Sequence, residues 1–108
     1  MMQLSNGWTK TEQQIAQKAF KKAHQREINH LIQQVRDNAS EIAELEDLWR
    51  LHDFLSARRH DIDGKYDYRE SMLLFVFAQL IQQGWLYLDD LEGLSKDKLT
   101  KISALTRM

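Results

Sequence analysis

The chain has 108 residues, no proline and no cysteine, and its 15 Lys/Arg and 16 Asp/Glu give a formal net charge of −1. This length fits a single domain over residues 1–108, and the absence of cysteine excludes disulfides, thiolate metal sites and thiol catalysis. No apolar run approaches the roughly 20 residues of a membrane span, and the first ten residues lack the regions of a signal peptide, so we expect a cytoplasmic protein.

The charge is distributed unevenly along the chain. Residues 1–36 hold six Lys/Arg and two Asp/Glu, whereas residues 37–70 hold five and ten. A basic segment can indicate nucleic-acid binding. Here the basic residues are dispersed and no aromatic platform lies among them, so we interpret them as a solvated face and expect no nucleic-acid partner.

A first long helix is predicted to begin near residue 10. Thr9 followed three positions later by Glu12 fits a capping box. From Ile15 to Val35, one residue in every four is apolar or small, with Glu27 as the exception in the series. Because four residues overshoot one helical turn, this face rotates along the helix, and its two ends should meet different neighbours.

A second long helix is predicted over about residues 40–62. Asn38 or Ser40 can cap its start, and Gly64 is placed to follow its end in the left-handed conformation. Each long helix of roughly 25 residues spans about 37 Å, which exceeds the ~34 Å diameter of a compact globule of this length. The overhanging apolar faces need a partner, so we expect a homodimer.

A third helix, over about residues 68–83, has almost no polar side, which is typical of a buried helix or of one that presents a binding patch. Gly84 ends this helix, and Ser95 caps a last, shorter one. No segment alternates in the manner of a strand. The sequence therefore predicts an all-α fold, with stalk helices at about residues 10–63 and a small head at about 67–108.

The second helix carries polar residues where a packed helix would be apolar. Trp49, His52, Ser56 and Arg59 follow the 3-4-3 spacing of a helix-pair seam, with Asp53 at its rim. Asp53 and Arg59 lie ~9 Å apart along the helix and about 120° apart around it, so they cannot easily pair within one chain. A two-fold axis would allow them to pair between chains. We call these five residues the polar seam.

The acidic residues around Gly64 suggest comparison with a calcium-binding loop. Four carboxylates would occupy loop positions three, five, nine and twelve: Asp61, Asp63, Asp67 and Glu70. Position one would then be Arg59, where a carboxylate is required. The pairs His52-Asp53 and His60-Asp61 resemble those of metal-dependent phosphohydrolases, but they point about 80° apart and lie ~12 Å apart along the helix. We expect no metal site, no cofactor and no enzymatic activity.

Two adjoining runs carry a resemblance to a known family: WRLHDFLSARRHDIDGKYD at residues 49–67 and DYRESMLLFVFAQL at residues 67–80. In these runs, and in its length, the chain resembles the fluorescence recovery protein of cyanobacteria. The resemblance implies an all-helical homodimer in which two long helices build an extended stalk and the dimer interface, and shorter helices form a head.

The resemblance also implies roles for individual residues. Four positions correspond to polar interface residues tied to activity: Trp49, His52, Asp53 and Arg59. Phe75 and Lys101 correspond to head positions that contact the orange carotenoid protein, the photoprotective quencher that this family antagonises. Ile32 corresponds to an aliphatic residue that supports dimerisation.

The function implied by the resemblance is regulatory. The protein would bind the C-terminal domain of the photoactivated orange carotenoid protein, accelerate its return from the red to the orange form, and promote its detachment from the phycobilisome. Antenna fluorescence would then recover. Its place would be near thylakoid-associated phycobilisomes, with only an indirect association with the membrane. The alternative is a helical dimeric adaptor of the same fold with a different protein partner.

Overall fold

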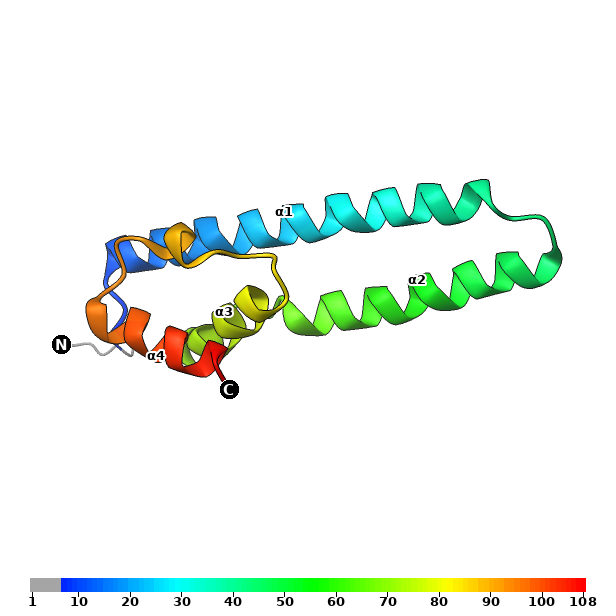
Figure 1. Ribbon diagram of the computed structural model, residues 1–108. Coiled ribbons are helices and arrows are strands. Elements are labelled where there is room, and N and C mark those ends of the chain that lie inside the picture. Colours follow the sequence, from blue (N-terminus) through cyan, green and yellow to red (C-terminus); the bar gives the residue numbers. More distant parts are fainter. Residues whose placement is uncertain (1–6) are drawn as a thin grey trace.

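The computed structural model describes residues 7–108 and contains helices and no strand in that range. Its elements are α1 (Lys10–Ser40), α2 (Leu45–Lys65), the 3₁₀ turn η1 (Glu70–Met72), α3 (Leu73–Gln82), the 3₁₀ turn η2 (Leu88–Leu91) and α4 (Lys96–Thr106). The predicted all-α fold is confirmed. Figure 1 shows α1 and α2 as the antiparallel arms of a long hairpin, with α3 and α4 gathered at one end of it. The molecule measures 60 × 24 × 23 Å.

The start of α1 is fixed by the predicted capping box. The Glu12 N–H donates to Thr9 Oγ1 at 3.0 Å, and the Thr9 N–H donates to Glu12 Oε1 at 3.1 Å. Glu12 also accepts hydrogen bonds from the Ser95 N–H at 2.8 Å and from Lys98 Nζ at 3.1 Å. One buried carboxylate therefore caps α1 and joins it to the start of α4.

The predicted boundary between the two long helices is wrong. We placed a cap at residue 38 or 40, but α1 continues to Ser40, whose hydroxyl donates to the Asp37 carbonyl oxygen at 2.7 Å. The second helix begins at Leu45. Asp47 supports this start, because its carboxylate accepts from the N–H groups of Ala43 and Glu44, both at 3.1 Å. These two hydrogen bonds hold the pKa of Asp47 below its usual value.

The predicted end of α2 is also wrong. Gly64 lies inside the helix, which continues to Lys65 and is capped by Tyr66. The continuation carries Lys65 toward α1, where its side chain is only 3% exposed and forms an ion pair with Glu27. The ion pair gives a physical reason for the longer helix. A left-handed Gly64 would have ended the helix before this contact could form.

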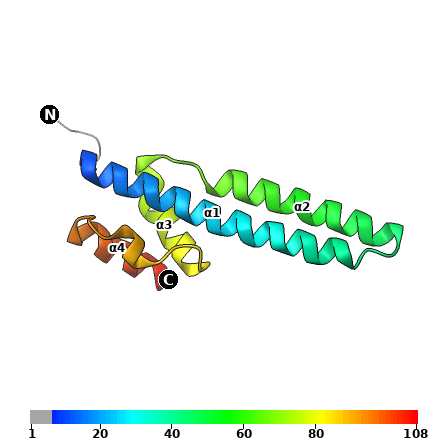
Figure 2. The ribbon, with the colours of Figure 1, turned by 90° about the horizontal axis from the view of Figure 1, so that it is seen from above.

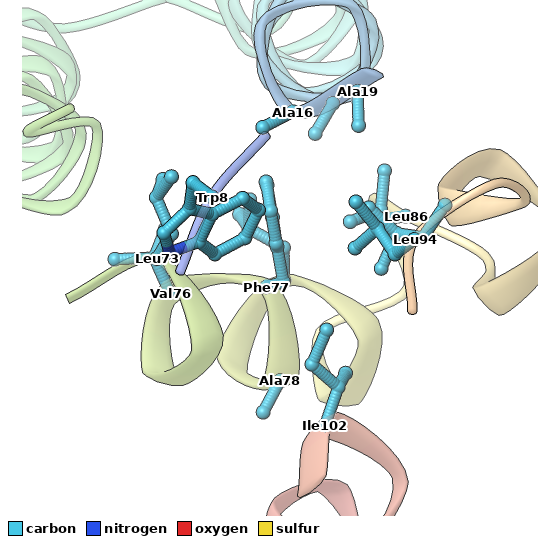
Figure 3. Packing of buried hydrophobic residues seen from close by; sticks show 13 residues of the cluster. Trp8, Ala16, Ala19, Leu73, Val76, Phe77, Ala78, Leu86, Leu94 and Ile102 are labelled. Carbon is cyan, nitrogen blue, oxygen red and sulfur yellow. The ribbon is translucent and has the colours of Figure 1, made fainter. Parts of the chain in front are cut away.

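The hydrophobic core lies at the end of the hairpin that holds α3 and α4. Figure 2 shows α3 beneath the N-terminal half of α1, with α4 beyond it. Figure 3 shows Ala16 and Ala19 pointing from α1 toward a cluster that includes Trp8, Phe77 and Leu86. Small alanine side chains allow the backbone of α1 to come close to the bulky residues of α3.

Candidate partner-binding surfaces

The hairpin leaves a large apolar surface uncovered in the single chain. Among the residues of α2, Ile62 and Lys65 are the buried ones. Five large apolar side chains of the two arms are exposed: Ile32, Leu45, Leu48, Trp49 and Leu55. Leu45, Leu48 and Trp49 are neighbours on α2 by their spacing, and an exposed apolar patch of this kind marks a candidate interface.

The polar seam lies on the exposed surface of α2. The rings of Trp49 and His52 are arranged edge to face at 6.5 Å, and His52 Nδ1 lies 3.4 Å from Asp53 Oδ1. Arg59 Nε lies 3.7 Å from Asp63 Oδ2, and both side chains are largely exposed. The structure therefore brings Trp49, His52 and Asp53 together, with Arg59 further along the helix. The exposed Arg59–Asp63 ion pair contributes little to stability, so the charge of Arg59 remains available to a partner.

The two predicted head residues line one shallow hollow. Phe75 of α3 is 55% exposed, and Lys101 of α4 forms an ion pair with Asp97 at 3.1 Å. The hollow, about 310 Å³ in volume, is lined by Leu74, Phe75, Lys101, Ala104 and Leu105. We call it the head hollow. Its walls are apolar, and the flexible Lys101 adds a positive charge at the edge.

Sequence reasoning found only part of the head hollow. It pointed to Phe75 and Lys101, and Phe75 is more than half exposed. It missed Leu74, Ala104 and Leu105. The spacing of Lys101, Ala104 and Leu105 places them on one face of α4, and that spacing is the signal that could have identified them.

A buried ionic cluster was also missed. The Glu27 carboxylate, 1% exposed, accepts hydrogen bonds from Arg58 Nη2 at 2.7 Å, Lys65 Nζ at 2.9 Å and the Tyr66 hydroxyl at 2.8 Å. Lys65 Nζ also donates to Gln83 Oε1 at 2.7 Å. We call these five residues the Glu27 cluster. The signal was present in the sequence, since Glu27 interrupts an otherwise apolar or small series on α1.

The ionisation of the Glu27 cluster follows from its geometry. Burial by itself raises the pKa of Glu27, but the hydrogen bonds from Lys65, Arg58 and Tyr66 outweigh it and hold the pKa below its usual value. Burial, followed by the hydrogen bond to Glu27, raises the pKa of the Tyr66 phenol. The cluster is therefore a carboxylate paired with two cations and a neutral phenol at neutral pH.

The acidic residues once compared with a calcium loop are engaged in other contacts. Asp61 accepts from Arg58 at 2.9 Å, and Glu70 accepts from Gln13 at 2.9 Å. Within residues 7–108, no three His or acidic side chains converge on a position that could hold a metal ion. Our expectation that the protein binds no metal stays a prediction. In the same range no helix combines the length and the apolar character that crossing a bilayer requires.

Residues 8–106 match the family described as "Photoprotection regulator fluorescence recovery protein". The chain belongs to the fluorescence recovery protein family. It is 50% identical over 101 residues to the fluorescence recovery protein of Synechocystis sp. PCC 6803, an alignment that covers 94% of this chain and 93% of that protein.

Solved structures of the family agree with this fold. The fluorescence recovery protein of Fremyella diplosiphon is 68% identical to this chain, with a TM-score of 0.91 over 94% of this chain and 100% of the other. The Synechocystis structure gives a TM-score of 0.90 at 50% identity, over 94% of this chain and 99% of the other. The resemblance carried by residues 49–67 is thereby confirmed, and the family is one of photoprotection regulators.

Proposed function

We propose that the protein binds the C-terminal domain of the photoactivated orange carotenoid protein without performing chemistry itself. Binding accelerates the relaxation of that protein from red to orange and its detachment from the phycobilisome, and antenna fluorescence recovers. Membership in a family of photoprotection regulators supports this proposal. The observation that carries it is the head hollow, which combines an exposed Phe75, apolar walls and a flexible cation.

The chemistry of the head hollow suggests what it binds. An exposed aromatic beside a concave apolar surface is typical of the anchor residues that dominate protein interfaces. Lys101 extends from the same surface and forms an ion pair with the exposed Asp97. We therefore expect an apolar side chain of the carotenoid protein to enter the hollow, with an acidic side chain beside it that takes over the pairing with Lys101.

We also propose that a second copy of the chain covers the exposed apolar surface of the hairpin. Ile32 and the apolar residues of α2 would form the centre of this dimer interface. Asp53 of one chain would pair with Arg59 of the other, with Trp49 and His52 packed beside them. A two-fold axis produces each such contact twice.

The dimer offers a physical route to acceleration. A regulator speeds a conformational change only if it binds the barrier state more tightly than the starting state. Two head hollows held at a fixed spacing could engage separated parts of the red form and favour their approach. The energy for the change would come from binding.

The proposal is tested with two substitutions in the head hollow, Phe75→Ala and Lys101→Glu. Each should weaken binding to the isolated C-terminal domain by tenfold or more, since interface anchors contribute ~2 kcal/mol or more. Each should also slow the red-to-orange relaxation in proportion. The exposed Lys96 lies on the first turn of α4 and outside the hollow, so Lys96→Glu is the matched control.

Calorimetry gives the affinity, and absorbance after blue light gives the relaxation rate. Circular dichroism and light scattering should show that both variants keep their fold and oligomeric state. Unchanged affinity in both variants would show that the head hollow does not bind the carotenoid protein. A wild-type protein that leaves the carotenoid protein's relaxation unchanged would favour the adaptor with a different partner.

A further inference from the structure

The Glu27 cluster joins three separate parts of the chain at one point. Glu27 belongs to α1, Arg58 and Lys65 belong to α2, and Tyr66 begins the connection to α3. Gln83, the residue that caps the end of α3, accepts from the same Lys65 ammonium at 2.7 Å. A single side chain of α2 therefore bridges the end of α3 and the middle of α1.

The placement of α2 depends strongly on this point. Ile62 and Lys65 are the buried residues of α2, and both lie in its last turn. The rest of the helix, from Leu45 onward, is exposed or half-buried in the single chain. By contrast, α1 is fixed to α3 by buried alanines that pack against Phe77. In the single chain the two arms of the hairpin are therefore held differently: α1 by an apolar core, and the end of α2 by the Glu27 cluster together with the buried Ile62.

Neutralising Glu27 would leave Arg58 and Lys65 with different partners. Arg58 would keep Asp61, to which it donates at 2.9 Å. Lys65 would keep the neutral Gln83, and Asp61 lies 3.7 Å from its ammonium. The ammonium would then remain buried with Asp61, an exposed carboxylate 3.7 Å away, as its counter-ion in place of the buried Glu27, and the least expensive response is to move it into water. Because Lys65 ends α2, exposing its ammonium means moving the end of α2.

We propose that the Glu27 cluster is a lock that sets the direction in which α2 leaves the head. With Glu27 charged, α2 lies against α1; with the carboxylate neutralised or removed, the end of α2 separates and the helix pivots about the connection at residues 66–69. The core between α1, α3 and α4 is unaffected. The proposal concerns the chain's own conformation and does not depend on the identity of the partner.

Other polar and titratable groups beside the Glu27 cluster can also affect the position of α2. Asp61 is the second carboxylate beside Arg58 and Lys65, and the His24 ring lies edge to face with the Tyr66 ring at 4.8 Å. Gln83 is neutral. Glu27 is the fully buried carboxylate among them, so its charge decides whether the two cations keep a buried counter-ion in addition to the exposed Asp61.

The pivot can be measured with pairs of spin labels, because the chain has no native cysteine. The reporting pair is Glu46→Cys on α2 with Gln79→Cys on α3, and the reference pair is Arg36→Cys on α1 with Gln79→Cys. All three positions are exposed. Since α2 has 21 residues and is about 30 Å long, a rotation of about 10° at its end displaces its start by about 5 Å. Labelled chains are mixed with excess unlabelled protein to isolate distances within one chain.

In the wild type both distance distributions should be narrow. Glu27→Gln should shift or broaden the reporting pair by several ångströms and leave the reference pair unchanged. Glu92→Gln, an exposed carboxylate of the head, is the matched control and should change neither pair. If Glu27→Gln does not fold, Tyr66→Phe removes one donor to the carboxylate and should broaden the reporting pair to a smaller degree.

Two results would overturn the lock. One is an unchanged reporting pair in the folded Glu27→Gln or Tyr66→Phe variant, which would show that other contacts fix α2. The other is equal broadening of the reporting and reference pairs, which would show a general loosening of the head. The double variant Glu27→Gln with Lys65→Met removes the buried ammonium together with the carboxylate. A reporting pair that is again narrow in this variant would support the lock.

Discussion

Lys65 Nζ lies 2.9 Å from Glu27 Oε2, and the two side chains are 3% and 1% exposed. Breaking such a pair by removing one partner typically costs about 3–5 kcal/mol, because the other charge is left buried. Removing both charges costs less. The pair therefore specifies how the two long helices meet more than it adds net stability.

The pH dependence of stability should reveal the Glu27 carboxylate. Its pKa in the folded chain is lowered, so its stabilising contribution is complete above the unfolded value near 4.5 and is lost as the pH falls through the folded pKa. The difference in unfolding free energy between wild type and Glu27→Gln should thus be constant near neutral pH and shrink below pH 4.5. Urea unfolding at a series of pH values measures it. A difference that grows on acidification would contradict the assignment.

The dimer should depend on Ile32. This side chain is 47% exposed in the single chain, and glutamate there would bury an unpaired charge in the proposed interface. Ile32→Glu should yield a monomer that keeps its helicity. Light scattering combined with circular dichroism tests this, and Gln33→Glu, on the neighbouring exposed position, is the control. A wild type that is already monomeric at tens of micromolar would reject the interface.

Asp53 and Arg59 should be coupled across the dimer. Asp53→Leu or Arg59→Leu should each weaken dimerisation, and exchanging the two charges should restore part of it. A double-mutant cycle on the dissociation constant measures the coupling energy. A value near zero would mean that these residues act independently, and the polar seam would then be better interpreted as a surface for the carotenoid protein.

Gly93 and Gly64 should respond in opposite directions to alanine. Gly93 has a φ of +106°, and a Cβ there would lie 2.5 Å from Ile15 Cδ1. Gly93→Ala should therefore destabilise the chain by about 1–3 kcal/mol. Gly64 lies in α2 with open space around it, so Gly64→Ala should stabilise by about 0.5–1 kcal/mol. Thermal unfolding of the two variants is a direct comparison, and destabilisation by both would contradict this account.

Local signals in the sequence predicted part of the fold well. Thr9 with Glu12, Ser95 and Gly84 each act on residues within one helical turn, and the structure confirms all three. The boundary near residue 40 was predicted wrongly because Ser40 can either cap a helix or continue one. In the structure the helix continues through Ser40, and Asp47, seven residues later, accepts the two backbone hydrogen bonds that start α2.

Contacts between distant segments could not be predicted in the same way. The periodic face of α1 placed Glu27 among residues that are buried, but nothing in the sequence paired it with Lys65, 38 positions later. For the head hollow, the difficulty was different. A helix that is apolar on every side has no polar face to show which side is covered, so the exposure of Phe75 was decided by the position of α4.

The hydrogen bond from the Ser95 N–H to Glu12 joins residues 83 positions apart. It has a consequence for the order of folding. The buried alanines of α1 stay uncovered until α3 and η2 have been synthesised, at residues 73–91, whereas the hairpin needs only the first 65 residues. Contacts of such long sequence separation form slowly, because the intervening chain must first be ordered. The nascent protein therefore presents an uncovered apolar face of α1 until residues 73–91 have emerged, and the packing of α3 and η2 against α1 ends this exposure to aggregation, before the Ser95–Glu12 hydrogen bond can form.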